Sequence, residues 1–252
     1  MMKKIWTIIV SLGLLVGAVT AWAFWDLPVH PPAKEFGNFL INRTSEKNNV
    51  KPATFSHWVH RQKHTCRVCH FELDFSLKVN TTEITEAANK AGRFCGAPGC
   101  HDGKTVFGHE KPHCEKCHNG DINYSKGKFP ALKNFPKTKY GNEIDWVKAL
   151  AQGLIKPKNE LTLPPADMSF EKMLSLEAEW SNIPPAVFPH KEHIAWLDCN
   201  NCHPDVFNIK KKTTKHFEMV RILKGEFCGA CHLNVAFPMD DCKRCHPKMS
   251  NH

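Results

Sequence analysis

All twelve cysteines of this 252-residue chain occur in pairs, and a histidine directly follows the second cysteine of each pair. Five pairs have the spacing C-x-x-C-H, whereas four residues separate Cys95 from Cys100 and His101 in the sixth. C-x-x-C-H is the attachment sequence of c-type haem. Both thiols form thioethers to the porphyrin, and the histidine becomes the proximal ligand of the iron. These residues therefore predict the chemistry of bound haem c.

The sequence predicts six covalently bound haem c groups, one for each cysteine pair. The attaching residues are Cys66 and Cys69, Cys95 and Cys100, Cys114 and Cys117, Cys199 and Cys202, Cys228 and Cys231, and Cys242 and Cys245. The predicted proximal ligands are His70, His101, His118, His203, His232 and His246. Each haem site is named after its proximal histidine, as in the His70 site. Disulfides and zinc sites also use many cysteines, but neither needs a histidine after every pair.

Two further histidine pairs are candidates for the distal axial ligands. His57 and His60 are three residues apart, as are His190 and His193, and this spacing places both imidazoles on one face of a helical turn. Each pair begins nine residues before the first cysteine of a C-x-x-C-H unit. We expect one histidine of each pair to bind the iron of that unit and the other to bind a neighbouring iron.

The chain contains an internal duplication, which is the clearest sign of its domain organisation. A shift of 133 positions places Phe55, His57, His60, Cys66, Cys69 and His70 on Phe188, His190, His193, Cys199, Cys202 and His203. The same shift places Gly92, Phe94, Cys95 and Gly96 on Gly225, Phe227, Cys228 and Gly229. The sequence therefore predicts two three-haem modules, at residues 54–120 and 187–252.

The distal ligand of the third haem in each module is left open by the sequence. In the second module the candidates are His216 and Met219, with Met239 held in reserve. The first module has glutamates at the positions equivalent to His216 and Met219, so its candidates are His109 and His113, with His64 less favoured. A methionine ligand would give its haem a higher reduction potential than a histidine would.

The pattern Phe55-x-His57-x-x-His60, followed by C-x-x-C-H and a Gly-x-Phe-Cys-Gly-Ala segment, resembles the cytochrome c7 family of triheme modules. These are relatives of cytochrome c3 from bacteria that respire metals, sulfur or sulfate. The resemblance covers both predicted modules. It implies a mainly α fold with much irregular structure, wrapped around closely packed haems that mostly have two axial histidines.

Three segments lie outside the predicted modules. Residues 1–25, with Lys3 and Lys4 before an apolar run, are expected to be a cleaved signal peptide, with a membrane anchor formed by residues 5–25 as the alternative. Residues 26–53 are expected to form an extended arm. Residues 121–186, the connector, are expected to be partly helical, with one helix over 144–150 and another over 169–180. The connector either packs the modules together or docks a partner.

Composition limits the possible functions. The chain is 42% hydrophobic, a value that the N-terminus and the cysteines inflate, so six porphyrins would have to supply much of the core. The net charge of +9 does not indicate nucleic-acid binding, because each haem would add two propionates. Haem attachment and the N-terminal segment both predict a periplasmic protein, or one otherwise outside the cytoplasmic membrane.

Electron transfer is the expected function, because two side-chain ligands on every iron would leave no open position for a substrate. The expected partners are other redox proteins, such as cytochromes, quinol- or hydrogenase-linked donors and terminal reductases of anaerobic respiration. One alternative is a multihaem reductase with an open iron, for which the stretched His101 site is the expected place. Another is a fixed subunit of a membrane oxidoreductase complex or of a cytochrome filament.

Overall fold

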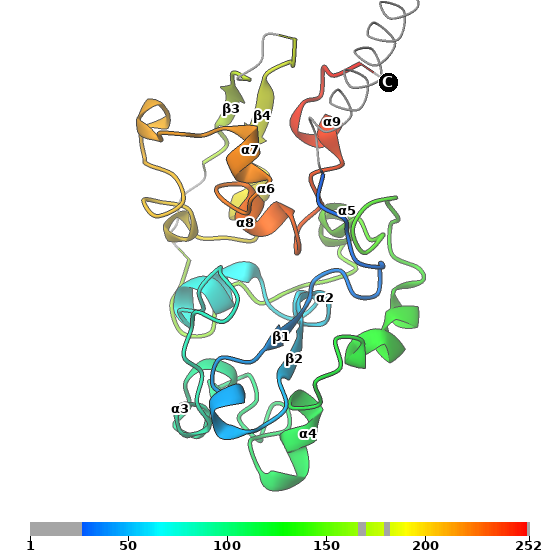
Figure 1. Ribbon diagram of the computed structural model, residues 1–252, viewed down its shortest axis with the longest axis vertical. Helices are drawn as coiled ribbons and strands as arrows, with labels where there is room; N and C mark the ends of the chain where they lie inside the picture. Colours follow the sequence, from blue (N-terminus) through cyan, green and yellow to red (C-terminus); the bar gives the residue numbers. More distant parts are fainter. Residues whose placement is uncertain (1–26, 166–169, 179–181, 251–252) are drawn as a thin grey trace, which may run out of the picture.

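The computed structural model describes residues 27–165, 170–178 and 182–250, so the predicted signal or anchor segment at 1–25 lies outside the described residues. Two lobes are visible, one above the other, with α5 (Trp146–Ala151) at one side of the boundary between them (Figure 1). The first lobe is the lower one in Figure 1 and contains the first predicted module. The second lobe contains the other module, and the connector joins the two.

Short elements make up both lobes. Those of the first lobe are β1 (Asn38–Ile41), η2 (Glu46–Asn48), β2 (Ala53–Ser56), α2 (His57–His60), the π-helical η3 (Val68–Glu72), α3 (Glu86–Lys90), η4 (Phe94–Gly96), η5 (Lys111–His113) and α4 (Cys114–Cys117). The connector adds η6 (Tyr124–Leu132) and α5. Those of the second lobe are β3 (Met173–Leu176), β4 (Ala186–Pro189), α6 (His190–Ile194), η7 (Cys199–Asn201), η8 (Lys211–Thr213), α7 (Met219–Ile222), α8 (Gly229–His232) and α9 (Cys242–Cys245).

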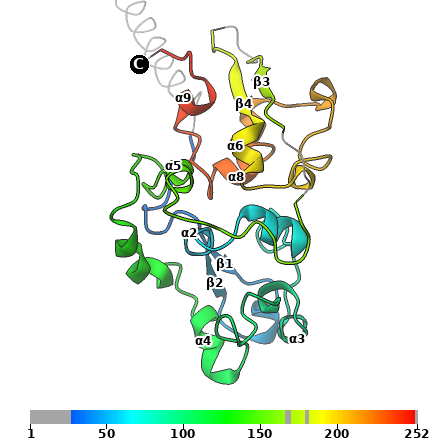
Figure 2. The same cartoon turned by 180° about the vertical axis from the view of Figure 1, so that it is seen from behind.

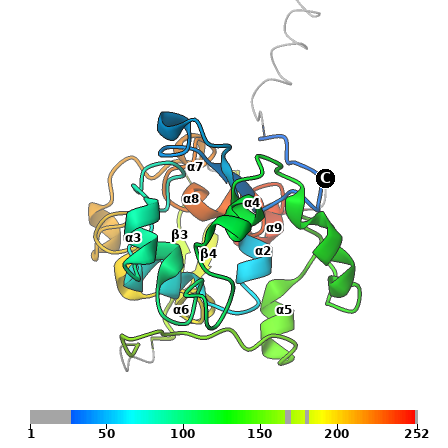
Figure 3. The same ribbon diagram turned by 90° about the horizontal axis from the view of Figure 1, so that it is seen from below.

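The helices are isolated turns joined by long irregular segments (Figure 3). Within the described residues no α-helix is longer than α5, which has six residues. Helices this short are not stable alone in water, because nucleation costs more than so few hydrogen bonds return. The expected irregular structure is therefore present, but the helical content is lower than a mainly α fold implies.

Each lobe begins with an antiparallel hairpin that leads directly into a His-x-x-His helix. β1 pairs with β2, which α2 follows at once, and β3 pairs with β4, which α6 follows at once. The helix predicted over 169–180 is therefore wrong at residues 173–176, which form β3. Pairing with the strand that precedes His190 outweighs the helical spacing of the apolar residues in this segment.

Equivalent glycines explain why glycine follows the first cysteine of the middle haem site in both lobes. A Cβ atom on Gly96 would lie 1.8 Å from the carbonyl oxygen of Asn89, and one on Gly229 would lie 1.9 Å from that of Ile222. Both distances are far shorter than any van der Waals contact, so only glycine allows each attachment segment to pack against the preceding helix. The structural repeat thus reproduces the 133-residue shift.

The connector supplies most of the larger apolar core. Trp58 of α2 packs there with four buried connector residues, namely Leu132, Ile144, Trp146 and Ile155. Trp196 of the second lobe packs against the same cluster. Figure 2 shows the connector running beside the first lobe to α5 and then crossing between the lobes. The connector therefore packs against both lobes, and α5 confirms the helix predicted over 144–150.

A buried arginine also joins the lobes. Arg67, which lies between Cys66 and Cys69, has a side chain only 2% exposed. Its Nε donates to Asp198 at 3.0 Å and its Nη1 donates to Glu72 at 2.6 Å. Asp198 directly precedes Cys199, so this network ties the first attachment segment of one lobe to the first of the other.

Among the described residues, no helix is long and apolar enough to span a membrane.

Candidate functional site

Every predicted proximal histidine is held by the same kind of hydrogen bond. The Nδ1 atom of each lies 2.7–3.2 Å from a main-chain carbonyl oxygen, which can only accept, so Nδ1 carries the hydrogen. The acceptors for His70, His101, His118, His203, His232 and His246 are Phe75, Phe107, Lys51, Phe207, Phe237 and Pro184. Nε2 is left with a free lone pair. Metal-binding histidines in proteins are typically fixed in this way.

The two His-x-x-His pairs follow the same rule. His57 and His60 donate from Nδ1 to the carbonyls of Gly37 and Ser56, at 3.1 and 2.8 Å. His190 and His193 donate to those of Lys172 and Pro189, at 2.7 and 2.8 Å. Gly37 and Lys172 both directly precede the first strand of a hairpin, so each hairpin fixes the tautomer of the histidine that follows it.

Burial keeps several of these imidazoles neutral. It is the main cause that lowers the pKa of His57 to about 3, and the pKa values of His60 and His232 to about 4. A neutral imidazole retains the Nε2 lone pair that a metal bond needs. These histidines are therefore ready to act as ligands at neutral pH.

Three distal candidates face three proximal histidines. The ring centres of His57 and His70 are 6.4 Å apart, and the planes of the two rings differ by only 7°. The separations are 6.2 Å for His60 and His101 and 6.1 Å for His193 and His232. Two imidazoles bonded through Nε2 to opposite sides of one metal, at the roughly 2 Å usual in proteins, have centres about 6 Å apart. The residues present therefore fit a haem iron between each pair.

A phenylalanine before each His-x-x-His pair orients both rings. Phe55 contacts His57 edge-on at 4.8 Å and stacks on His60 at 4.4 Å. Phe188 repeats this arrangement with His190 at 4.8 Å and His193 at 4.2 Å. The Phe-x-His-x-x-His spacing thus has a local physical reason, since one aromatic ring restricts two imidazoles.

The stretched His101 site keeps a backbone hydrogen bond between its histidine and its first cysteine. The backbone N–H of His101 donates to the carbonyl of Cys95 at 2.9 Å, just as His118 does to Cys114 at 2.8 Å. The additional residues form a turn in which Gly99, at φ +83°, donates to Asp102 at 2.9 Å. The two extra residues are therefore accommodated in a turn, and the contact between histidine and first cysteine is kept.

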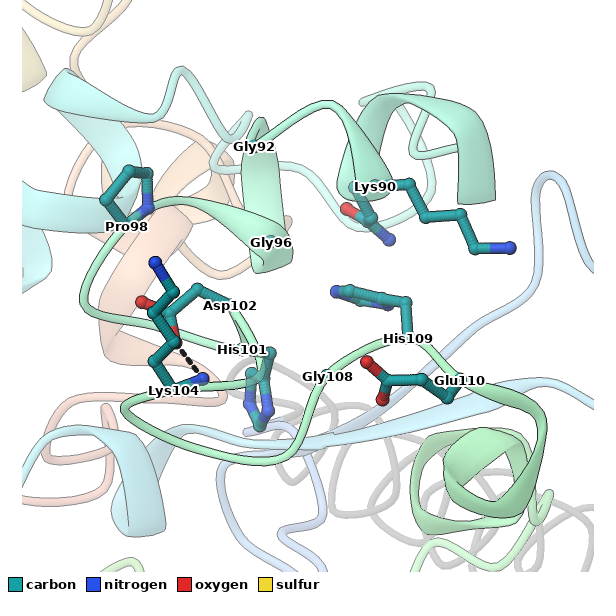
Figure 4. Close-up of a pocket in the computed structure, with 11 residues that line it drawn as sticks. Lys90, Gly92, Gly96, Pro98, His101, Asp102, Lys104, Gly108, His109 and Glu110 are labelled. Atoms are coloured by element: carbon teal, nitrogen blue, oxygen red, sulfur yellow. Dashed lines mark hydrogen bonds between the residues drawn. The ribbon is translucent and has the colours of Figure 1, made fainter.

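A pocket of about 440 Å³ lies beside this site, and His101 and His109 both line it (Figure 4). The reductase alternative places an open iron at the His101 site, but His60 lies opposite His101 there. His109 has a buried Nε2 with no hydrogen-bond partner. By contrast, Nδ1 of His113 lies 3.2 Å from the Glu110 carboxylate. A carboxylate on Nδ1 leaves Nε2 of His113 available for a metal bond, just as the unpartnered Nε2 of His109 is, so both histidines remain candidates for the third haem of the first lobe.

The candidates in the second lobe differ in burial. His216 is exposed, whereas Met219 is partly buried and packs against the cluster of Ile222, Leu233 and Met239. Met239 is 8% exposed. His64, the less favoured candidate of the first lobe, has a buried Nδ1 without a partner, so it lacks the carbonyl bond that the C-x-x-C-H and His-x-x-His histidines share.

The attachment thiols of neighbouring sites lie close enough for their charges to interact. Burial is the main cause that raises the pKa values of Cys69, Cys95, Cys228 and Cys231 to about 12, and thiols of other sites raise them further. The neighbouring thiols are Cys117 for Cys95, Cys100 and Cys95 for Cys69, Cys66 and Cys202 for Cys231, and Cys245 and Cys202 for Cys228. The six sites are therefore connected: the first lobe joins the second from Cys66 to Cys231, and the His203 and His246 sites both adjoin the His232 site.

All twelve cysteines lie in the described part of the chain, and none forms a disulfide. Among the described residues, no group of three or more His, Cys, Asp or Glu side chains is placed to hold a metal ion. The acceptors that fix His57, His118, His190 and His246 come from the arm and the connector, outside the predicted modules. Residue type gives no sign of this, because every residue has a main-chain carbonyl.

A model of the family "Cytochrome c7 and related cytochrome c" matches residues 53–119 and 186–247, which is half of the chain. Among solved structures, the C-terminal hexaheme fragment of GSU1996 is 25% identical, covers 86% of this chain and 99% of its own, and gives a TM-score of 0.27. The dodecaheme cytochrome c GSU1996 is 25% identical, covers 85% of this chain and 75% of its own, and gives a TM-score of 0.30. The comparison with curated proteins finds no match.

Proposed function

Because the chain belongs to the family of cytochrome c7 and related cytochromes c, we propose that it is a hexahaem electron carrier with two three-haem modules, at residues 54–120 and 187–252. The observation that carries the proposal is the shared environment of ten histidines. All six C-x-x-C-H histidines and all four His-x-x-His residues have Nδ1 bonded to a carbonyl and Nε2 left free.

Bound haem c would supply a one-electron iron(III)/iron(II) couple whose potential depends on axial ligands, burial and nearby charge. The chain's own residues hold the cofactor and set these conditions. The cysteine pairs would anchor each ring, and the proximal histidines would bind the iron from one side. His57, His60 and His193 would bind the irons of the His70, His101 and His232 sites from the other. By the 133-residue shift, His190 takes the same role at the His203 site.

We propose that the protein works outside the cytoplasmic membrane, delivered there by residues 1–25. Its donors would be quinol- or hydrogenase-linked redox proteins, and its acceptors other cytochromes or terminal reductases. Transient redox contacts are small and weak, so co-purification of a fixed partner, or a polymer seen by electron microscopy, would instead favour a subunit of a complex or filament.

The mass of the mature, intact protein tests the number of haems. We expect the polypeptide plus six haems, because the stretched site keeps the hydrogen bond between histidine and first cysteine that the His118 site has. The Cys95→Ser/Cys100→Ser variant is the matched control and should lose one haem. A wild-type mass with five haems, unchanged in the variant, would show that the stretched site is not used.

Near-infrared magnetic circular dichroism tests the ligands and the electron-carrier function together. We expect every haem to be low-spin, and a His/Met band only if Met219 or Met239 is a ligand. Met219→Leu should remove such a band, while Met173→Leu, which changes an exposed methionine of β3, should leave the spectrum as it is. A high-spin haem that binds cyanide in the wild-type protein would contradict the carrier proposal and favour the reductase.

A further inference from the structure

Arg61 lies at the contact between the two lobes, immediately after the His-x-x-His pair of the first. Its Nη2 donates to the main-chain carbonyl of Val235 at 2.9 Å, a bond between residues 174 positions apart. Val235 is three residues beyond His232, the proximal histidine of the middle site of the second lobe. One guanidinium therefore spans from a distal-ligand helix of the first lobe to a proximal-ligand segment of the second.

The position of the guanidinium is fixed by the core. Its Cζ lies 5.2 Å from the ring centre of Trp146, in the geometry of a cation–π contact. Trp146 is itself buried in the larger apolar cluster, and its Nε1 donates to Asn142 at 3.1 Å. An arginine stacked on a buried and anchored ring has little freedom to turn its charge toward solvent.

No carboxylate among the described residues pairs with Arg61. Arg67, the buried arginine of the first attachment segment, pairs with Glu72 and Asp198, whereas Arg61 forms no ion pair in the described part of the chain. Burial lowers the pKa of Arg61, and the nearby thiols of Cys66 and Cys231 partly offset this effect. Burial is the main cause that lowers the pKa values of His57 and His232, and Arg61 is a smaller cause in the same direction for both. Its positive charge therefore acts on residues of both the His70 site and the His232 site.

The two lobes meet at this same place. In Figures 1 and 2, α8, which carries His232, lies at the edge of the second lobe that faces α2. Cys66 of the His70 site and Cys231 of the His232 site are the thiols at which the first lobe joins the second. Arg61 therefore lies where the His70 and His232 sites approach each other.

We propose that Arg61 is a positioning residue for the electron exchange between the lobes, whose fixed positive charge raises the reduction potentials of the haems at the His70 and His232 sites together. The inference rests on the proposed haem-binding function. An iron(III) centre with its axial histidines carries one positive charge more than the iron(II) form. Arg61 is partly buried. A nearby cation disfavours the more positive form, and the lower dielectric of the protein interior strengthens the effect. The couple moves one electron and makes or breaks no bond.

Pairing the two sites electrostatically has a functional consequence. A charge that shifts both potentials in the same direction by a similar amount leaves the difference between them unchanged, so it raises the affinity of both sites for electrons without adding a barrier to exchange between them. The other four sites would be affected less, since Cys66, Cys231, His57 and His232, with which the charge of Arg61 interacts, belong to these two sites. The two haems at the contact between lobes would then have higher potentials than the same haems would have without Arg61.

The test is a redox titration of the full-length holoprotein, in which NMR resolves the individual haems. Arg61→Gln removes the charge but keeps an amide that can donate to Val235. We expect the oxidised-to-reduced ratio of two haems to rise about tenfold at a fixed applied potential, while that of the other four changes little. For a one-electron couple this rise corresponds to a fall of about 59 mV in the reduction potential. His57→Ala and His193→Ala, each of which opens one of the two sites, identify the affected signals.

Two controls separate charge from structure. Arg61→Lys keeps the charge without the planar contact to Trp146, so its potentials should stay near those of the wild type, even if Arg61→Gln fails to accumulate. Arg43→Gln removes an exposed arginine that pairs with Glu83 and should shift no haem by a comparable amount. The inference would be overturned if Arg61→Gln shifted the reduction potentials of all six haems equally or of none. It would also be overturned if the reduction potentials fell as much in Arg61→Lys as in Arg61→Gln.

Haem content is measured on the same samples by the pyridine haemochrome method. A failure of the proposed function changes the number of haems, whereas a failure of the inference leaves six haems with unmoved potentials. The two failures are therefore distinguishable.

Discussion

Replacing His57 by alanine is expected to convert one of six haems from low spin to high spin while all six stay attached. Attachment depends on the thiols, and the nearest of these, Cys66, is nine residues away in sequence. The imidazole of His57 lies 6.4 Å from that of His70, with a free Nε2, and no other histidine is recorded opposite His70 among the described residues. Losing it leaves the iron at the His70 site with an open position.

Electron paramagnetic resonance and the high-spin charge-transfer band measure this change, and cyanide should bind the opened site. His190→Ala should give the same result at the His203 site, because both histidines occupy the same place after a hairpin. His30→Ala is the matched control, since Nε2 of His30 faces Asp240 at 3.4 Å and no proximal histidine. A wholly low-spin spectrum of His57→Ala would remove His57 from the ligands.

Replacing Arg67 by methionine is expected to lower the free energy of unfolding by about 3–5 kcal/mol, the cost of leaving buried charges without their partner. The side chain of Arg67 is 2% exposed and that of Glu72 is 1% exposed, so water cannot replace the lost contact. Methionine keeps most of the volume of the stem and alters neither Cys66 nor Cys69. The change therefore tests the ion network and not haem attachment.

Denaturant unfolding followed by circular dichroism measures this loss. Arg43→Met is the control, because Arg43 and Glu83 form a largely exposed pair that should contribute no more than about 1 kcal/mol. A loss in Arg67→Met as small as that in Arg43→Met would contradict a role for Arg67 in joining the lobes.

The pH dependence of the same measurement gives a second check. Burial alone would raise the pKa of Glu72, but backbone N–H groups of Leu161, Thr162 and Leu163, together with Arg67, outweigh it and hold that pKa below its ordinary value of 4.5. A carboxylate with a lowered folded-state pKa stabilises the protein above its unfolded pKa, and this stabilisation is lost as the pH falls through the folded-state value. The difference between wild type and Arg67→Met should therefore shrink in acid.

The attachment chemistry was predictable because it is local. A thiol pair and its histidine lie within five residues in five of the sites, so their spacing alone specifies the cofactor. The His-x-x-His pairs were predictable for the same reason, since a helical turn and one phenylalanine place both imidazoles. The strand at 173–176, where a helix over 169–180 was expected, was not predictable. It depends on pairing with β4, and the helical spacing of apolar residues carries no information about such a partner.

The sequence by itself determined the cofactor, its predicted number, the duplication and the family. These follow from residue types at short, repeated spacings. The tertiary structure decided which histidine faces which, as with His60 and His101, and which carbonyls of the arm and connector orient the candidate histidines. It also decided that Arg67 and Arg61 join the lobes. Each of these contacts joins residues far apart in the chain, and a main-chain carbonyl is available at every position, so no local residue pattern predicts them.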